Sequence, residues 1–162
     1  MHPLAILQAL LLLTLANGTP VIAKKIFGRR FARPLDGGAV LADGRPVFGR
    51  SKTIRGIAVA ILVTTALAPL LGLDPSTGAL AAATAMAGDL LSSFIKRRLD
   101  RPPSSRALGL DQLPESLLPL LACRAPLSLS AADIALAVAI FFVGELVLSR
   151  LLYRLHLRDQ PY

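Results

Sequence analysis

The stretch that decides the fold is GDLLSSFIKRRLDRPPSSRALGLDQLPE, residues 88–115. It begins inside an apolar run and places Asp89 where a membrane-spanning helix rarely carries a charge. Three consecutive cations, residues 96–98, follow at the end of that run, and Asp111 and Glu115 come after a polar loop. Carboxylates that bracket a cationic loop near one membrane surface suit a metal ion and a polyphosphate.

The composition is that of a membrane protein. Of the 162 residues, 54% are hydrophobic and 17% are charged, whereas soluble domains are about 45–50% apolar and about 25% charged. No segment resembles a linker, so we expect one membrane-embedded domain over 1–162. The net charge of +8 suits loops that face anionic lipid or a phosphate-bearing substrate, and we expect no nucleic acid partner. A single Cys excludes an intramolecular disulfide.

Apolar runs predict an all-α integral membrane protein with five transmembrane helices. Most of these runs are long enough to cross a hydrocarbon core of about 30 Å. The predicted spans are 3–22, 57–73, 78–95, 108–122 and 131–148. The fourth is short and holds Pro114 and Pro119, so we expect it to cross tilted or broken.

The basic residues predict the orientation of the chain in the membrane. Of the 18 Lys and Arg residues, all but Arg124 lie on the side of the two polar loops and the C-terminus. The positive-inside rule then places the N-terminus outside and the C-terminus in the cytoplasm. We therefore expect a multi-pass protein of the inner (plasma) membrane, in which the two cytoplasmic loops form the active site.

Two helix ends in the sequence allow two interpretations each. Asn17, Gly18 and Pro20 interrupt the end of the first span, which indicates either a kinked helix end or a broken helix that presents Asn17 to a ligand. Residues 51–56, SKTIRG, place two cations and two hydroxyls at the start of the second span. Free N–H groups and the helix dipole favour an anion there, although a basic flank with Ser51 as N-cap explains the same residues.

The third span carries polar residues on one face. Asp89, Ser93 and Lys96 follow at spacings of four and three, so they lie along the same side of a helix. A carboxylate inside a span is a functional candidate by default, and a structural ion pair with a neighbouring Arg is the alternative. In the first loop, two Asp-Gly turn signals flank the short run 39–42, which could form one arm of a hairpin.

The unusual polar groups support chemistry at phosphorus. Carboxylates are the usual protein ligands of Mg²⁺, which shares its remaining positions with water and substrate phosphates. Surrounding cations would neutralise a triphosphate. Neither a His-rich cluster nor a Ser-His-Asp set is present, and a metal-assisted attack by a lipid phosphate needs no protein nucleophile. The composition therefore permits such a reaction without proving it.

Five motifs make the chain similar to a known family. They are LANGTPV at 15–21, LDGG at 35–38, DGRPVFGRSKTIRG at 43–56, GDLLSSFIKRRL at 88–99, and PSSRALGLDQLPESLLPLL at 103–121. In this order and spacing they resemble the CDP-archaeol synthase family, which is related to the phosphatidate cytidylyltransferases. One departure is Ile54, where the family often has an aromatic residue after Lys-Thr.

The resemblance implies that CTP and a membrane lipid phosphate react to give a CDP-lipid and pyrophosphate, with Mg²⁺ as cofactor. It implies Asp89, Asp111 and Lys96 as catalytic residues. The two aspartates would hold the metal, with Glu115 as a further candidate ligand. The predicted nucleotide-binding residues, taken from the motifs and the polar groups beside them, are Asn17, Lys52, Thr53, Arg55, Ser93, Arg97, Arg98, Ser105 and Arg106.

Two questions stay open in the sequence. The acceptor could be an archaetidic-type ether lipid, phosphatidic acid, or another isoprenoid or acyl phosphate. The alternative functions are a small membrane transporter or carrier of lipid phosphates, and a non-catalytic membrane subunit. Carriers usually show paired repeats, and no convincing repeat is present.

Overall fold

A computed structural model of the chain describes residues 1–102, 107 and 109–154. Its helices are α1 (Pro3–Phe27), α2 (Ile54–Leu67), the 3-10 helix η1 (Ala68–Leu71), α3 (Pro75–Arg98), α4 (Gln112–Ala122) and α5 (Ala131–Arg154). Within the described residues the remaining regular pairing is limited to two isolated β-bridges. The predicted all-α fold is confirmed for this part of the chain.

Four helices are long and apolar enough to cross a membrane. They cover Pro3–Phe27, Ile54–Leu71, Pro75–Arg98 and Ala131–Leu151 within the described residues. Helix α4 has 11 residues and therefore spans about 17 Å, well short of a hydrocarbon core of about 30 Å. Five predicted spans are thus not confirmed. The predicted start of the fourth, residue 108, lies outside the described residues.

Helix α1 is continuous through Pro20 and ends at Phe27, five residues beyond the predicted end. The interpretation of the first span as a broken helix is therefore wrong. Proline removes one backbone donor and strains the turn before it, but packing of α1 against α2 and α3 holds the helix together. Asn17 remains partly buried in this helix, and its amide nitrogen is buried without a hydrogen-bond partner in the described residues.

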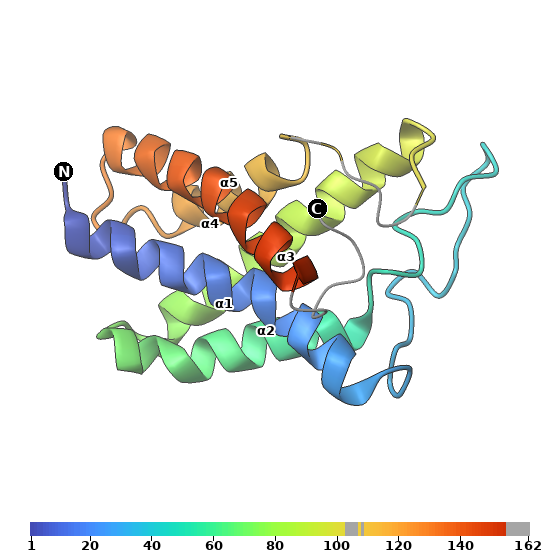
Figure 1. Cartoon of the computed structure of the whole chain (residues 1–162), viewed down its shortest axis with the longest axis horizontal. Coiled ribbons are helices and arrows are strands. Elements are labelled where there is room, and N and C mark those ends of the chain that lie inside the picture. The colour runs from blue at the N-terminus through green and yellow to red at the C-terminus, as the bar shows by residue number, and fades with distance from the viewer. Residues whose placement is uncertain (103–106, 108, 155–162) are drawn as a thin grey trace.

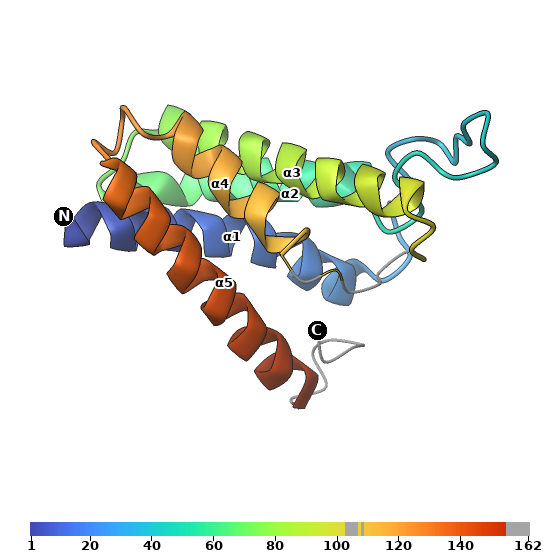
Figure 2. The same ribbon diagram turned by 90° about the horizontal axis from the view of Figure 1, so that it is seen from above.

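The helices alternate in direction along one bundle, and α5 tilts away from the others (Figure 2). The N-terminus and the turn before α5 lie at one end of the bundle, and the loop between α1 and α2 lies at the other (Figure 1). At the N-terminal end, the backbone nitrogen and Nδ1 of His2 contact the carboxylate of Asp133 at 3.0 and 2.9 Å. This contact ties the start of α1 to the start of α5.

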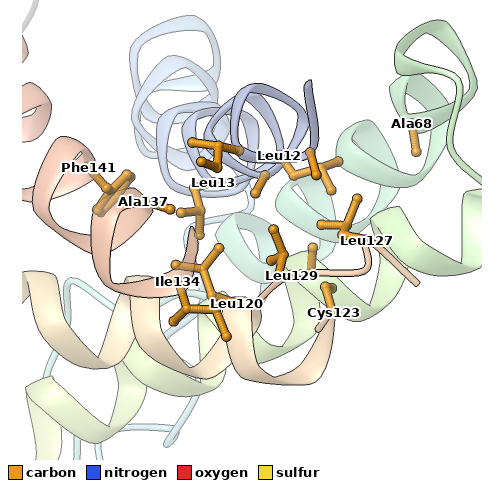
Figure 3. Packing of buried hydrophobic residues seen from close by; sticks show 14 residues of the cluster. Leu12, Leu13, Ala68, Leu120, Cys123, Leu127, Leu129, Ile134, Ala137 and Phe141 are labelled. Carbon is orange, nitrogen blue, oxygen red and sulfur yellow. The ribbon is translucent and has the colours of Figure 1, made fainter. Parts of the chain in front are cut away.

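The main apolar core lies between α1, α4 and α5. Leu12 and Leu13 from α1, Leu120 from α4, and Ile134 and Phe141 from α5 belong to this cluster (Figure 3). Many large apolar side chains on the outer faces of the helices remain exposed in the isolated chain. That outward apolar surface is what a bilayer would cover.

Small residues let α3 approach its neighbours closely, because Ala and Gly leave room for the backbone of the next helix. A Cβ placed on Gly78 would lie 2.7 Å from the carbonyl oxygen of Thr64 in α2. A Cβ placed on Gly88 would lie 2.2 Å from the carbonyl oxygen of Pro114 in α4. Neither position can hold a larger residue unless the helices move apart.

Candidate active site

The loop between α1 and α2 folds into a hairpin over residues 34–53, which we call the polar hairpin. Antiparallel bridges join Pro34 to Thr53 and Val40 to Pro46. The predicted hairpin arm at 39–42 is thus confirmed in outline. The hairpin projects from the end of the bundle opposite the N-terminus (Figures 1 and 2).

Asp36 organises the polar hairpin from within. Its carboxylate accepts backbone N–H groups from Gly38 at 3.0 Å, Phe48 at 2.9 Å and Gly49 at 3.1 Å. Burial by itself raises the pKa of Asp36, but the backbone donors of Phe48, Gly38 and Gly49 outweigh it and hold that pKa below its ordinary value. Because these donors come from both arms, the carboxylate fixes the shape of the hairpin.

Arg98, at the end of α3, fastens the hairpin to the bundle. Its guanidinium donates to the Asp43 carboxylate at 2.6 Å and to the carbonyl oxygens of Pro46 at 2.6 Å and Arg45 at 3.2 Å. The same group lies 5.2 Å from the centre of the Phe94 ring. Arg98 is a predicted nucleotide-binding residue, and in this structure its donors hold the hairpin.

Two other predicted nucleotide-binding residues have structural contacts at the start of α2. Thr53 is the N-cap, and its hydroxyl accepts the N–H of Gly56 at 3.1 Å. The cap expected at Ser51 therefore lies two residues later. The Arg55 guanidinium donates to the carbonyl oxygens of Gly28 and Arg30, which brace the chain as it leaves α1.

Lys52 reaches from the hairpin to the third helix. Its ammonium donates to both carboxylate oxygens of Asp89. Both side chains are about one-fifth exposed, at 21% and 22%. Asp89 is therefore ion-paired, as the structural interpretation of this residue expected. Its partner is a Lys from the hairpin, however, and not a neighbouring Arg.

A second ion pair lies further along the same face of α3. The ammonium of Lys96 lies 2.6 Å from the carboxylate of Asp111, the residue that precedes α4. Asp111 also accepts the N–H of Ala107 at 3.1 Å. Asp89 and Asp111 thus each face a different lysine, while Lys96 also acts electrostatically on Asp89. Ser93 lies between the two pairs in sequence and is buried.

Glu115 brings a third carboxyl group to the site. It is buried on α4, and its carboxyl group lies beside that of Asp89, close enough for the two groups to interact. The close approach of Gly88 to the backbone of Pro114 and Glu115 makes this contact possible. Sequence reasoning missed Gly88, although a glycine directly before an intramembrane aspartate is a usable signal of close helix packing.

The remaining predicted nucleotide-binding residues are not part of the two ion pairs. Arg97 is buried beside the loop after α3, and Asn17 lies on α1 as described above. Ser105 and Arg106 lie outside the described residues.

The carboxyl groups at this site are of the kind that binds a divalent cation. Mg²⁺ is typically bound through one or two carboxylates and shares its other positions with water and substrate phosphates. Asp89 and Glu115 supply two carboxyl groups in contact, and two such groups repel when both are ionised, so a cation between them would relieve that repulsion. Within the described residues no group of three or more acidic, His or Cys side chains is close enough to form a metal cage by itself.

The fold and the site define a helical membrane protein whose charged residues gather at one end of the bundle. The family profile described as "CarS-like: CDP-archaeol synthase" matches residues 73–162. The CDP-archaeol synthase of Pyrobaculum calidifontis is 36% identical in an alignment of 152 positions that covers 91% of this chain and 90% of that protein. The CDP-archaeol synthase of Pyrococcus furiosus is 40% identical over 125 residues, 69% of this chain and 70% of that protein. The chain belongs to the CDP-archaeol synthase family.

A solved structure supports the same relationship. It is described as "Structural insight into an intramembrane enzyme for archaeal membrane lipids biosynthesis" and superposes with a TM-score of 0.68 at 30% sequence identity. The match covers 84% of this chain and 89% of the solved chain. The sequence prediction of the family is therefore confirmed.

Proposed function

We propose that the polar end of this bundle is where the chain, a CTP-dependent cytidylyltransferase, makes a CDP-activated lipid from CTP and a lipid phosphate. Family membership supports the reaction class and does not favour a carrier or a non-catalytic subunit. The observation that carries the location is the convergence of Lys52, Asp89, Lys96, Asp111 and Glu115 from the hairpin, α3 and the start of α4.

The reaction exchanges one bond at phosphorus. An oxygen of the lipid phosphate attacks the α-phosphorus of CTP, and the bond from that phosphorus to the oxygen bridging it to the β-phosphorus breaks. The products are the CDP-lipid and pyrophosphate. Such a displacement depends mainly on positioning and on neutralising the phosphate charges.

The two lysines would supply part of that neutralisation. Lys52 and Lys96 are paired with carboxylates in the free protein, and each could turn from its aspartate to a phosphate oxygen when CTP enters. Asp89 and Glu115 would hold Mg²⁺ through their two carboxyl groups, whereas Asp111 lies against Lys96 and does not form a group of three with them within the described residues. The ion would offset the charge on the phosphates of CTP and polarise the phosphorus under attack.

The acceptor would enter from the bilayer. Helices α1, α2, α3 and α5 are long and apolar enough to cross it, and the site includes Lys52, just before α2, and residues of the last turns of α3. We place this end at the cytoplasmic surface because the basic residues gather in its loops. A CDP-archaeol-like or a CDP-diacylglycerol-like product is compatible with this arrangement.

Purified protein with radiolabelled CTP, Mg²⁺ and a panel of lipid phosphates tests the proposal. The panel contains an archaetidic-type ether lipid phosphate, phosphatidic acid and an isoprenyl phosphate, and the readout is labelled CDP-lipid. Asp89→Asn should lower turnover by about 100-fold or more, because a charge that acts on the transition state is removed.

The matched control is Asp74→Asn. Asp74 is an exposed N-cap residue at the opposite end of α3 and makes no side-chain capping hydrogen bond. That variant should keep wild-type turnover. Full activity in a folded Asp89→Asn variant would remove Asp89 from the active site, and no product with any lipid phosphate would refute the proposed reaction.

A further inference from the structure

Cations and exposed apolar side chains alternate where the chain leaves α1. We call residues 24–33, KKIFGRRFAR, the basic segment. It holds five Lys or Arg residues and no carboxylate. The exposed arginines of this segment are Arg29, Arg30 and Arg33. The exposed large apolar side chains among them are Ile26, Phe27 and Phe31. Cationic and apolar surface in one short segment is typical of chain that lies on an anionic membrane surface.

The length of α1 places the basic segment at a membrane surface. The helix has 25 residues and is therefore about 37 Å long, which exceeds a hydrocarbon core of about 30 Å. Lys24 and Lys25 lie in its last turn, and their charges favour the headgroup region over hydrocarbon. The helix ends at the same end of the bundle as the polar hairpin (Figure 1). The basic segment thus begins where lipid headgroups meet the protein.

The backbone of the basic segment is held in one shape by the start of α2. The Arg55 guanidinium donates to the carbonyl oxygens of Gly28 and Arg30 and lies 5.9 Å from the centre of the Phe27 ring. The N–H of Arg30 also donates to the carbonyl oxygen of Phe27 at 3.0 Å. A surface that is already ordered loses less conformational entropy when it binds a partner.

Phe31 has a backbone conformation that its contacts within the chain do not explain. Its φ is 58°, in the left-handed region that bulky residues disfavour. Its side chain is 77% exposed, so burial within the chain does not compensate for this conformation. Strained residues of this kind cluster at functional sites. An aromatic side chain at the level of the headgroups would gain apolar contact with lipid.

We propose that the basic segment is a binding surface for anionic lipids, in which Arg29, Arg30 and Arg33 pair with headgroup phosphates and Phe31 inserts beside the acyl chains. The combination of charges and apolar side chains selects this occupant. An acidic peptide would match the arginines but leave Phe31 in water, and a neutral lipid would cover Phe31 without favouring the cations. This surface lies apart from the ion pairs of Lys52 and Lys96, and the inference does not depend on the proposed reaction.

Tryptophan fluorescence in bilayers tests this surface directly. The chain contains no Trp, so Phe31→Trp introduces a single reporter at the segment. The protein is reconstituted in mixed phosphatidylcholine and phosphatidylglycerol, and one lipid or the other carries bromine on its acyl chains, which quenches nearby Trp. Brominated phosphatidylglycerol should quench with a binding constant about threefold or more above that of brominated phosphatidylcholine, because several cations attract the anionic headgroup. Salt at about 1 M should reduce this ratio.

Two controls match the reporter and the charge. Leu70→Trp places a Trp at an exposed position of η1, in a stretch, 56–95, without Lys or Arg, and its ratio should be near one. With the Phe31→Trp reporter, Arg29→Gln combined with Arg33→Gln should at least halve the ratio. Arg50→Gln combined with Arg101→Gln removes the same charge from two other exposed positions and should leave the ratio unchanged.

The outcomes decide the inference whether or not CDP-lipid forms. If Phe31→Trp fails to fold, Ile26→Trp provides the reporter, since Ile26 is also exposed. A ratio near one at the basic segment would overturn the proposal, and so would a ratio that Arg29→Gln with Arg33→Gln leaves unchanged. An equal fall in the control pair would show that the segment is not specific. Absence of quenching by either lipid would place the segment in water and refute the binding surface.

Discussion

Replacement of Gly88 by Ala tests whether close packing of α3 on α4 assembles the candidate active site. The new Cβ would lie 2.2 Å from the carbonyl oxygen of Pro114 and 2.8 Å from the backbone nitrogen of Glu115. An ordinary contact is about 3.5 Å, so the helices must separate locally by about 1 Å. Backbone atoms cannot rotate away as a flexible side chain can.

The expected loss of stability combines two opposing effects. Overpacking of a close contact costs about 1–3 kcal/mol, and the backbone contact favours the upper end. Alanine offsets about 1 kcal/mol of this loss, because it forms helices better than glycine does. A net loss of about 2 kcal/mol corresponds to roughly 4–8 °C in unfolding temperature for a chain of this size.

The assay is thermal unfolding in detergent, read from the reactivity of the buried Cys123. The matched control is Gly144→Ala in α5, where a Cβ would have no atom within 4 Å, and it should be neutral or slightly stabilising. At temperatures well below unfolding, Gly88→Ala should also lose activity, because Glu115 moves away from Asp89. A Gly88→Ala protein as stable and active as the Gly144→Ala control would refute this packing argument.

Two further predictions concern the polar hairpin. The pKa of Asp36 is lowered in the folded state, so its contribution to stability is present above the unfolded-state pKa of about 3.9 and is lost as the pH falls through the lower folded-state value. The Phe48 amide should therefore lose its protection from hydrogen exchange below about pH 4, once the rates are corrected for intrinsic exchange. Asp36→Asn should remove this pH dependence. Protection that stays constant to lower pH in the wild type would contradict this role of Asp36. Arg98→Gln should loosen the hairpin by about 1–3 kcal/mol and speed its limited proteolysis, whereas Arg50→Gln should not; equal cleavage rates in the two variants would show that Arg98 does not fasten it.

Much of this protein is determined by local sequence. Long apolar runs must form helices in a bilayer, because only internal hydrogen bonding satisfies the backbone there. That reasoning places α1, α2, α3 and α5 within six residues of their observed bounds. The motifs from 15–121 also identify the family, and the grouping of Lys52, Asp89, Lys96 and Asp111 at one end follows from the direction of the runs.

The partners of the charged residues were decided by tertiary structure. Lys52 pairs with Asp89 across 37 positions of sequence, and Arg98 contacts the hairpin 52 to 55 positions away. No local periodicity determines such contacts, since they depend on how loops close and how helices pack. Asp36 likewise shapes the hairpin only because the fold brings the N–H groups of both arms to its carboxylate.

Tertiary packing also decided that α1 is continuous and that α4 is short. Pro20 predicts an interruption, yet α1 continues because neighbouring helices hold its backbone in place. Helix α4 is shorter than a span and is held by the backbone contact at Gly88. Sequence therefore determined which segments are helical and where charge gathers, while packing distances between helices decided which side chains meet.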